Sequence, residues 1–389
     1  MALKSAPLQS SDDPAFDDIG PCRDRDVQEQ LQCIISDRTV ISSILRFRYP
    51  LLSKSRLCSL ILGPLVKRLL MRKEASVRTI AQFQQQVADF MEHVISATTD
   101  GVTYEGFDEL EKGKGYLFIS NHRDISLDPA FIDMALFTHG LDTVRIAIGD
   151  NLLRIPAATS LMRLNKSFIV RRSLSSPREK LKAFTHLSEY IGLSVAEGHS
   201  VWIAQREGRA KDGNDRTEDA VLKMIGLNGR TRRQSFGDYM KGLNIVPVAI
   251  SYEYDPNDEA KARELCERAA HGGEYHKEEF EDIETITRGI RGEKGRICVR
   301  AGEVISGGFE TPEELAAIID TFIWSNYEIF PPSKIAAGED EGVSDAERAR
   351  FESRLSSCPE ELREQVRSMY AAPLKNRRLC LEKRGEGAK

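Results

Sequence analysis

The sequence predicts an α/β fold in which a mostly parallel or mixed central sheet is flanked by helices, with a smaller helical domain at the N-terminal end. The alternation of two kinds of segment leads to the α/β part of this prediction. From about residue 116 to residue 324, short apolar segments alternate with longer segments whose apolar residues recur every three or four positions. Strands separated by helices in this way form β-α-β units, and such units build sheets covered by helices.

The N-terminal part of the chain is predicted to have two regions. Residues 1–25 combine Ser, Pro, Asp and Gly without periodicity, and we expect them to be disordered. Residues 26–100 are predicted to form the helical domain, because apolar residues recur at helical spacing near both of its ends. Between these ends, residues 56–73 are apolar with Arg and Lys at both ends. This composition suits either a helix lying on an anionic membrane surface or a buried helix of a small bundle.

Residues 101–330 are predicted to form the α/β domain. The expected strands are 116–120, 144–148, 167–171, 200–204, 245–252 and 296–304. The expected helices are 129–137, 177–197, 217–225, 258–270, 278–291 and 312–324. Pro331 and Pro332 end this domain, and residues 331–389 are predicted to be an exposed helical tail rich in Arg and Glu.

Composition excludes several classes of protein. The net charge is −5, with 55 Lys and Arg against 60 Asp and Glu, so nothing favours nucleic-acid binding. The seven cysteines never fall in a Cys-x-x-Cys pair, which argues against a zinc site and a disulfide framework and fits a reducing compartment. There is no run of 18 uncharged apolar residues. We therefore expect a cytoplasmic protein, either free or peripheral on the inner face of a membrane.

One loop carries the strongest chemical signal. His122 follows the predicted strand 116–120, and Asp128 is placed at the N-cap of the next helix with Pro129 at its first position. Across such a loop, a histidine can act as a general base while a carboxylate fixes its tautomer. A polar loop histidine without catalytic function is the alternative interpretation.

Part of this loop also resembles a second motif, which the rest of the sequence excludes. His122-Arg123-Asp124 looks like the catalytic loop of a protein kinase, in which an asparagine five residues after the aspartate binds a metal. Pro129 stands at that position, and no Asp-Phe-Gly occurs in the chain. The kinase interpretation therefore fails.

Basic residues follow two other predicted strands. Lys166 precedes the strand 167–171, and Arg171 and Arg172 come at its end. The strand 200–204 is followed by a loop with Arg209, Lys211, Gly208 and Gly213. Ligands of α/β sheets bind at the carboxyl ends of strands, and arginine is preferred for phosphate because its planar guanidinium donates two hydrogen bonds. The sequence thus predicts an anion site beside His122.

Four blocks in this order resemble the glycerolipid acyltransferases, over about residues 115–252. They are Asn121-His122 with Asp128-Pro129-Ala130, residues 149–172, residues 203–213, and the proline-bearing strand 245–248. The first block has five residues between His122 and Asp128 where the family has four, and Gly208-Arg209 is one residue shorter than the usual Gly-x-Arg turn. The N-terminal helical region is also similar to the soluble plastid glycerol-3-phosphate acyltransferases, which implies a two-domain, peripheral architecture.

This resemblance implies a reaction and a role for each matching residue. His122 would deprotonate a glycerol hydroxyl that attacks an acyl thioester, Asp128 would orient the imidazole, and acyl-CoA or acyl carrier protein would be the co-substrate. Glycerol 3-phosphate is favoured as the acceptor over lysophosphatidate by the block Phe168 to Arg172. No metal and no further cofactor are expected. The implied phosphate ligands are Arg171, Arg172, Arg209 and Lys211, supported by Asn121, Lys166 and Gly208.

Three alternatives are weighed against this interpretation. Asp124 is the alternative partner of His122, but it lies only two positions away, so we expect it to bond loop amides instead. A catalytically inactive lipid-phosphate binding module would explain the extra residue between His122 and Asp128. A phosphoester hydrolase would need a nucleophile or metal motif, and no Gly-x-Ser-x-Gly or paired aspartate motif occurs.

Overall fold

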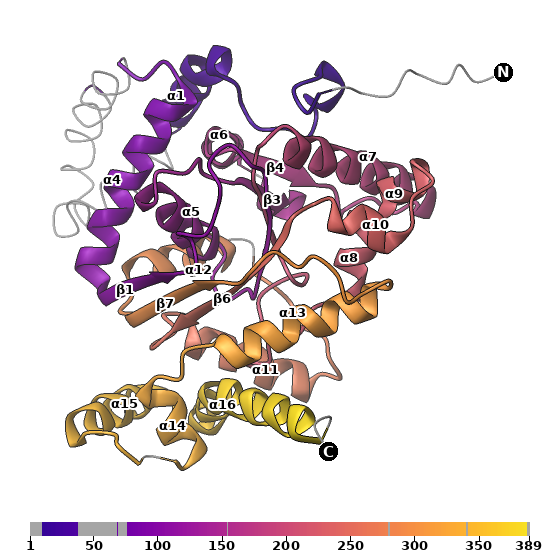
Figure 1. The fold of residues 1–389 in the computed structure, drawn as a ribbon. Helices are drawn as coiled ribbons and strands as arrows, with labels where there is room; N and C mark the ends of the chain where they lie inside the picture. The colour runs from indigo at the N-terminus through magenta and orange to yellow at the C-terminus, as the bar shows by residue number, and fades with distance from the viewer. Residues whose placement is uncertain are drawn as a thin grey trace. The chain divides into compact units, whose positions relative to one another are not determined.

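The chain divides into two compact units. The computed structural model describes residues 10–37, 68, 76–153, 155–278, 281–339 and 341–386. The first unit consists of Met1–Phe90 and Arg145–Tyr190, and the second of Met91–Val144 and Ile191–Lys389 (Figure 1). These limits differ from the predicted boundaries near residues 100 and 330, because residues 145–190 of the predicted α/β domain group with the N-terminal segment and the C-terminal helices group with the rest of that domain.

The first unit is built on one β-α-β crossover. β3 (Arg145–Gly149) and β4 (Ser167–Val170) pair in parallel, with Ile146 opposite Ser167 and Gly149 opposite Val170. The helices and short 3-10 turns of this unit, two of which continue into the second unit, are η1 (Pro14–Phe16), η2 (Asp24–Asp26), α1 (Val27–Ser36), α4 (Ile80–Thr98), η4 (Asp150–Leu152), α6 (Pro156–Leu164) and α7 (Pro177–Ala196). Its helical core consists of Cys22, Val27, Leu31, Val77, Phe83 and Leu164.

The prediction of disorder does not hold for residues 10–25. The Phe16 ring stacks on the imidazole of His186 in α7, with 4.5 Å between ring centroids, and its side chain is buried. The Ile19 carbonyl accepts a hydrogen bond of 2.8 Å from the Ile169 amide in β4. A buried aromatic ring and a backbone hydrogen bond to β4 therefore hold in place a segment whose overall composition is polar.

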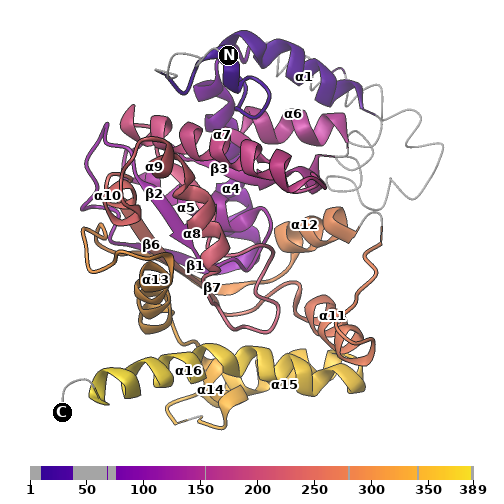
Figure 2. The same cartoon turned by 90° about the vertical axis from the view of Figure 1, so that its right-hand side faces the viewer.

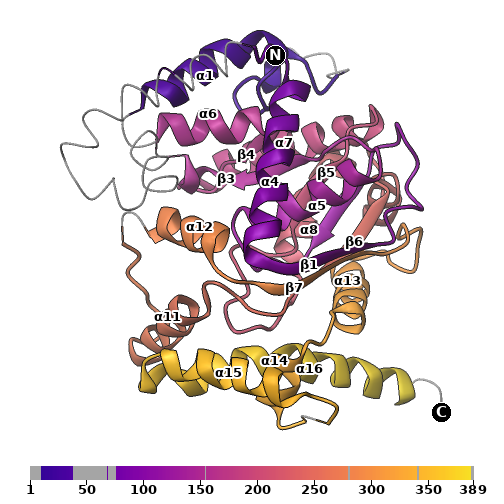
Figure 3. The same ribbon diagram turned by 90° about the vertical axis from the view of Figure 1, so that its left-hand side faces the viewer.

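The second unit contains a mixed sheet with the strand order β1-β7-β6-β2-β5. β2 lies parallel to β5 and β6, whereas β6 and β7 are antiparallel. β2, β5 and β6 are buried along their whole length, because helices cover the sheet. The α/β prediction is therefore confirmed. The strands are β1 (Thr99–Glu105), β2 (Leu117–Ser120), β5 (Val201–Ala204), β6 (Ile245–Tyr252) and β7 (Gly295–Ala301); Figure 3 shows β1 beside β7.

The helices of this unit agree in place with most predicted ones. Thr311 caps α13 by accepting from the Glu314 amide, and the Glu314 side chain returns a bond to the Thr311 amide, which forms a capping box. The helices up to residue 326 are α5 (Leu127–Thr138), α8 (Asp219–Ile225), α9 (Leu227–Thr231), α10 (Phe236–Lys241), α11 (Asp258–Ala270), α12 (Glu281–Arg291) and α13 (Pro312–Asn326).

The C-terminal helices are not an exposed tail, which corrects the sequence prediction. α14 (Pro331–Ala337), α15 (Asp345–Ser357), η5 (Glu360–Leu362) and α16 (Arg363–Glu386) follow one another, and α16 lies alongside α14 (Figure 2). Their apolar residues stand three or four positions apart within strongly charged helices, so the average composition hides a buried face. This face forms a core cluster that includes Tyr254, Ala262, Phe351, Leu355, Leu362, Val366, Met369 and Tyr370.

None of the helices in the described part of the chain is long and apolar enough to cross a membrane. The cationic, apolar stretch 56–73, for which the sequence left a membrane surface and a bundle core as alternatives, lies outside the described residues apart from Arg68. Its membrane contact stays a prediction.

Candidate active site

The site begins where β2 ends. Asn121 is buried, and its side chain bonds the backbone of β6 in both directions. Its Nδ2 donates to the Ile250 carbonyl at 2.9 Å, and its Oδ1 accepts from the Ile250 amide at 2.8 Å. The side chain thus continues the β2–β6 pairing past the last strand residue and fixes the start of the loop that carries His122.

His122 and Asp128 form a direct pair. His122 Nδ1 lies 2.8 Å from Asp128 Oδ2, and Asp128 is fully buried whereas 13% of the His122 side chain is exposed. A carboxylate only accepts, so Nδ1 carries a proton, and in the neutral imidazole Nε2 then has the free lone pair. Within the described part of the chain, Nε2 has no hydrogen-bond partner. The edge of Trp202 supports the imidazole at 5.9 Å between ring centroids.

Asp128 accepts three further hydrogen bonds. The amides of Arg123 and Asp124 donate to Oδ2 at 2.6 and 2.9 Å, and Tyr252 Oη donates to Oδ1 at 2.9 Å. Asp128 is not the N-cap that the sequence suggested, because α5 begins at Leu127 and Asp128 lies in its first turn. Its carboxylate instead turns back to the loop, where four donors hold it.

Asp124 bonds the amides at the start of α5. Its Oδ1 accepts from Ser126 N at 3.0 Å and from Leu127 N at 2.9 Å. Burial and the nearby charge of Asp128 raise the pKa of the Asp124 carboxyl, and the two amides offset part of this rise. Its Oδ2 lies against α12, where a Cβ added to Gly289 would be only 2.3 Å away.

Arg123 links the His122 loop to the loop after β5, which the sequence did not suggest. Its guanidinium forms a buried ion pair of 2.6 Å with Asp215 and lies over the Tyr327 ring, 5.1 Å from the centroid. The Arg123 carbonyl accepts from Lys261 Nζ at 2.6 Å. A charged residue between His122 and Asp124 was the only sequence signal, and its partners lie far away along the chain.

The loop after β5 runs beside His122. The Gln205 amide donates to the Ser120 carbonyl and the Ala210 amide donates to the His122 carbonyl, at 2.9 and 2.8 Å. Gly208 has a φ of 72°, a conformation that glycine adopts without strain, so the chain turns there. Arg209 follows this turn.

The two predicted phosphate ligands of this loop differ in their surroundings. Arg209 has no ion pair or hydrogen bond within the described residues, and its charge offsets a small part of the rise in the pKa of the Asp124 carboxyl. Lys211 instead forms an ion pair with the buried Glu264, which also binds Arg268 at 2.9 Å. Arg209 is therefore the cation that this loop leaves available for an anion, whereas the charge of Lys211 is compensated by Glu264.

The other predicted phosphate ligands lie in the first unit. Arg171 forms an ion pair of 2.9 Å with Asp18, and both side chains are more than 40% exposed. The Arg172 amide donates to Asp150 Oδ1 at 3.2 Å, and Lys166 precedes β4 with a φ of 55°. That these three residues serve the same ligand as His122 stays a prediction.

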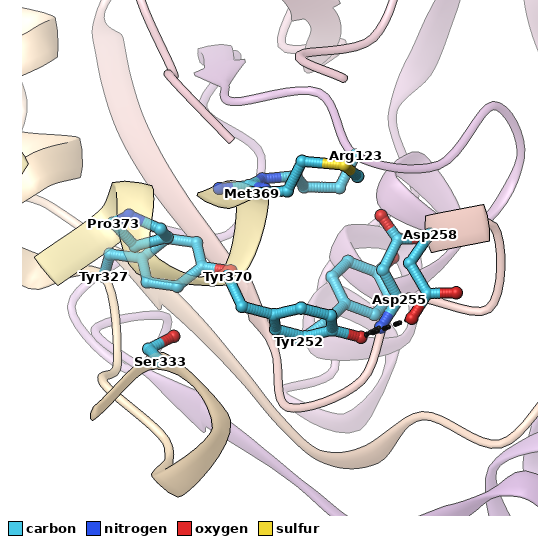
Figure 4. A pocket seen from close by; sticks show the side chains of 9 residues that line it. All are labelled: Arg123, Tyr252, Asp255, Asp258, Tyr327, Ser333, Met369, Tyr370 and Pro373. Atoms are coloured by element: carbon cyan, nitrogen blue, oxygen red, sulfur yellow. Dashed lines mark hydrogen bonds between the residues drawn. The ribbon is translucent and has the colours of Figure 1, made fainter. Parts of the chain in front are cut away.

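A small cavity in the second unit is lined in part by Arg123 and Tyr252 (Figure 4). Its volume of about 20 Å³ is enough for one water molecule but not for a substrate. Among the described residues, no group of three or more His, Cys, Asp or Glu side chains is arranged to hold a metal ion. The cavity is lined by Arg123, Tyr252, Asp255, Asp258, Tyr327, Ser333, Met369, Tyr370 and Pro373.

Comparisons with known proteins identify the region that contains this site. Residues 101–251 match the family model described as Acyltransferase. Among solved structures, the chain is similar to the 1-acyl-sn-glycerophosphate (LPA) acyltransferase PlsC from Thermotoga maritima, with 14% identity and a TM-score of 0.36. This match covers 76% of this chain and 93% of that chain. A search of curated proteins found no match.

Proposed function

We propose, from the match of residues 101–251 to the family model described as Acyltransferase, that the protein transfers a fatty acyl group from an acyl thioester to a hydroxyl of glycerol 3-phosphate. The donor would be acyl-CoA or acyl carrier protein. The observation that carries the proposal is the His122–Asp128 pair, because in the neutral imidazole it leaves Nε2 as the lone-pair nitrogen, without a partner within the described residues.

The proposed reaction uses His122 first as a base and then as an acid. Nε2 takes the proton of the glycerol hydroxyl as its oxygen attacks the thioester carbonyl. The resulting tetrahedral intermediate collapses, the carbon–sulfur bond breaks, and the departing thiolate takes the proton from the imidazolium. Asp128 keeps the imidazole in the required tautomer and stabilises the imidazolium. A thioester is already activated, so direct attack by the acceptor suffices.

Arg209 is the leading candidate for binding the phosphate of the acceptor. This guanidinium follows Gly208 in the loop that bonds the His122 carbonyl, and it has no anionic partner within the described residues. Arg171 and Arg172, with Lys166 before them, are proposed as further phosphate ligands on the basis of the sequence resemblance. Lys211 is retained as a weaker candidate, because its ion pair with Glu264 would have to open.

Two other functions are considered. Lysophosphatidate carries the same phosphate and a free hydroxyl, so it is the alternative acceptor. An inactive lipid-phosphate binding module would keep Arg209 but would not need an oriented imidazole. The 2.8 Å contact between His122 and Asp128 favours an enzyme, since the extra loop residue has not separated the pair.

Thiol release from an acyl thioester tests the proposal. We expect release with glycerol 3-phosphate and a loss of about 10²- to 10⁴-fold in His122→Ala, because general-base catalysis is removed. His139→Ala is the matched control, since His139 lies at the end of α5, where its Nδ1 contacts the Ala135 carbonyl. A folded His122→Ala variant with nearly parental rates would contradict the mechanism. If release were faster with lysophosphatidate than with glycerol 3-phosphate, lysophosphatidate would be the proposed acceptor.

Localisation forms part of the proposal. The product would carry an acyl chain, which must reach a lipid bilayer. We propose a cytoplasmic protein that associates peripherally with an anionic membrane surface, and the sequence stretch 56–73 is the candidate for this contact.

A further inference from the structure

Asp128 has a second carboxylate oxygen that the His122 interaction does not use. Oδ1 accepts a hydrogen bond of 2.9 Å from the hydroxyl of Tyr252, the last residue of β6. Two features fix this hydroxyl. Asn121 binds the β6 backbone at Ile250, two residues earlier. The Tyr252 ring packs edge-on against Phe131 of α5, with 5.9 Å between centroids.

The direction of this hydrogen bond follows from its environment. The carboxylate can only accept, so the Tyr252 hydroxyl donates. Burial, together with the charges of Asp128, Asp124 and Asp255, raises the pKa of Tyr252 well above its ordinary value. The hydroxyl therefore remains a donor at every pH at which the enzyme would work.

We propose that Tyr252 is a positioning residue for acyl transfer, whose hydroxyl completes a hydrogen-bond chain from Tyr252 through Asp128 to His122 and sets the proton affinity of the imidazole. The part of this inference that concerns the reaction rests on the proposed function. The hydrogen-bond chain itself is a property of the folded protein and can be tested without turnover.

The physical argument concerns how the charge of Asp128 is shared. Tyr252 is the donor to Oδ1, and without it this buried oxygen would have no hydrogen-bond partner within the described residues. A less compensated carboxylate attracts the imidazolium more strongly, so His122 would hold its proton to a higher pH. The hydroxyl thus offsets part of the Asp128 charge that faces the imidazole of the proposed general base.

Other charged groups face this chain, and none replaces the hydroxyl. Asp124 lies beside Asp128 and bonds the amides of α5. Arg123 is paired with Asp215, and Arg209 and Lys294 act on Asp124 through their charges. These groups are the same in a variant that lacks only the Tyr252 hydroxyl. A change in His122 titration would therefore report the loss of this one donor.

The test compares Tyr252→Phe with Tyr254→Phe. Both variants keep the ring and remove a buried hydroxyl, but Tyr254 Oη has no hydrogen-bond partner within the described part of the chain. The imidazole resonances are followed by NMR during a pH titration, and His122 is identified by the signal that His122→Gln removes. We expect the His122 midpoint to rise by on the order of one pH unit in Tyr252→Phe and to stay unchanged in Tyr254→Phe.

The pH profile of kcat/KM provides the second measurement. Tyr252→Phe should lose up to about tenfold on the acid limb, below the parent midpoint, and recover at higher pH, because this limb moves upward with the midpoint. A purely structural role would lower the rate at every pH. An unchanged midpoint in folded Tyr252→Phe would overturn the inference.

Two further outcomes have interpretations of their own: a parent protein without activity, and a Tyr252→Phe variant that does not fold. If the parent protein releases no thiol with either acceptor but the midpoint still rises in Tyr252→Phe, the proposed function fails and the hydrogen-bond chain stands. If Tyr252→Phe does not fold, 3-fluorotyrosine at position 252 replaces it, since a more acidic hydroxyl donates more strongly. The midpoint should then fall, and an unchanged or higher midpoint would overturn the inference.

Discussion

Two carboxylates in one loop differ in what they bind. Asp128 accepts hydrogen bonds from the imidazole, two loop amides and the Tyr252 hydroxyl. Asp124 accepts hydrogen bonds from the amides of Ser126 and Leu127. The spacing in the sequence alone left both residues as candidates. The hydrogen-bond partners assign the histidine to Asp128 and the helix start to Asp124.

Asparagine at these two positions should therefore have different effects on the rate. In Asp128→Asn, the amide favours the wrong imidazole tautomer, and we expect kcat to fall on the order of 10²-fold or more. In Asp124→Asn, the side-chain oxygen still accepts from both amides, and a fall of less than about tenfold is expected. Initial rates of thiol release, measured on variants with parental circular dichroism, check the order. The reverse order would make Asp124 the partner of His122.

A third carboxylate gives a prediction on stability. Asp320 in α13 accepts a 2.7 Å hydrogen bond from the Thr217 amide, and burial raises the pKa of Asp320 to about 6. Because the folded state holds this proton more tightly than the unfolded chain, the ionised carboxylate opposes folding above about pH 6, and the effect disappears near pH 4. Asp320→Asn keeps the acceptor and removes the charge.

Thermal unfolding of Asp320→Asn as a function of pH measures this effect. We expect the variant to be more stable than the parent by about 1–2 kcal/mol at pH 8, with allowance for partial exposure, and equal to it at pH 4. An advantage that is the same at both pH values would show that the carboxylate charge is not its cause.

Sequence reasoning at this scale found residues that are close along the chain and missed those that are not. His122 and Asp128 stand six positions apart. The partners that hold them lie much further away: Tyr252 is 124 residues from Asp128, and Asp215 is 92 residues from Arg123. Lys211 was predicted as a phosphate ligand because Glu264, 53 residues later, could not be placed beside it.

At the scale of helices and strands, the elements whose sequences show one clear pattern were predicted best. The predicted bounds of β6 and α11 agree with the structure, since one is a continuous apolar run and the other has a regular helical period. β1 was missed because it contains Asp100 and Gly101 and pairs only with β7. α6 was missed because it has only nine residues and directly follows a loop.

The contact between α12 and the His122 loop gives a prediction in which two effects oppose each other. Gly→Ala inside a helix usually stabilises it by about 1 kcal/mol. A Cβ at Gly289 would lie 2.3 Å from Asp124 Oδ2, and Asp124 cannot move freely because two amides hold its other oxygen. The steric conflict therefore outweighs the helix propensity.

We expect Gly289→Ala to lose about 1–3 kcal/mol of unfolding free energy and to lower thiol release, because α12 or the loop must shift. Gly307→Ala is the control, since no atom lies within 4 Å of its added Cβ. Denaturant unfolding of both variants measures the difference. Equal stabilities would show that the loop adapts to the methyl group without cost.

At the scale of the whole chain, the C-terminal helices contribute to the second unit as well as covering it. Arg354 in α15 and Tyr370 in α16 both bond Asp258 Oδ2, at 2.6 and 2.9 Å. Lys261, in the same helix as Asp258, donates to the Arg123 carbonyl next to His122. A polar network thus connects residues near the end of the chain with the loop that carries the base. The sequence predicted the helices but not this connection, since it depends on partners about a hundred positions apart.

Membrane association is the last property that belongs to the whole protein, and the sequence stretch 56–73 predicts it. We expect reversible, salt-sensitive binding to anionic vesicles and little binding to neutral ones, because each cation near such a surface contributes about 1 kcal/mol. Replacing Arg68, Arg72 and Lys73 by Gln should weaken flotation with anionic vesicles on the order of 10²-fold. Thiol release from a water-soluble donor should not change.

The matched control removes the same number of positive charges elsewhere. Arg230, Arg232 and Arg233 are exposed at the end of α9, and their replacement by Gln lowers the net charge equally. If only the first triple variant loses vesicle binding, the stretch 56–73 is the contact. If both variants lose it to the same extent, binding follows net charge alone. If the first variant floats as the parent does, the stretch is not the membrane contact, and the bundle interpretation of its apolar residues is the one to retain.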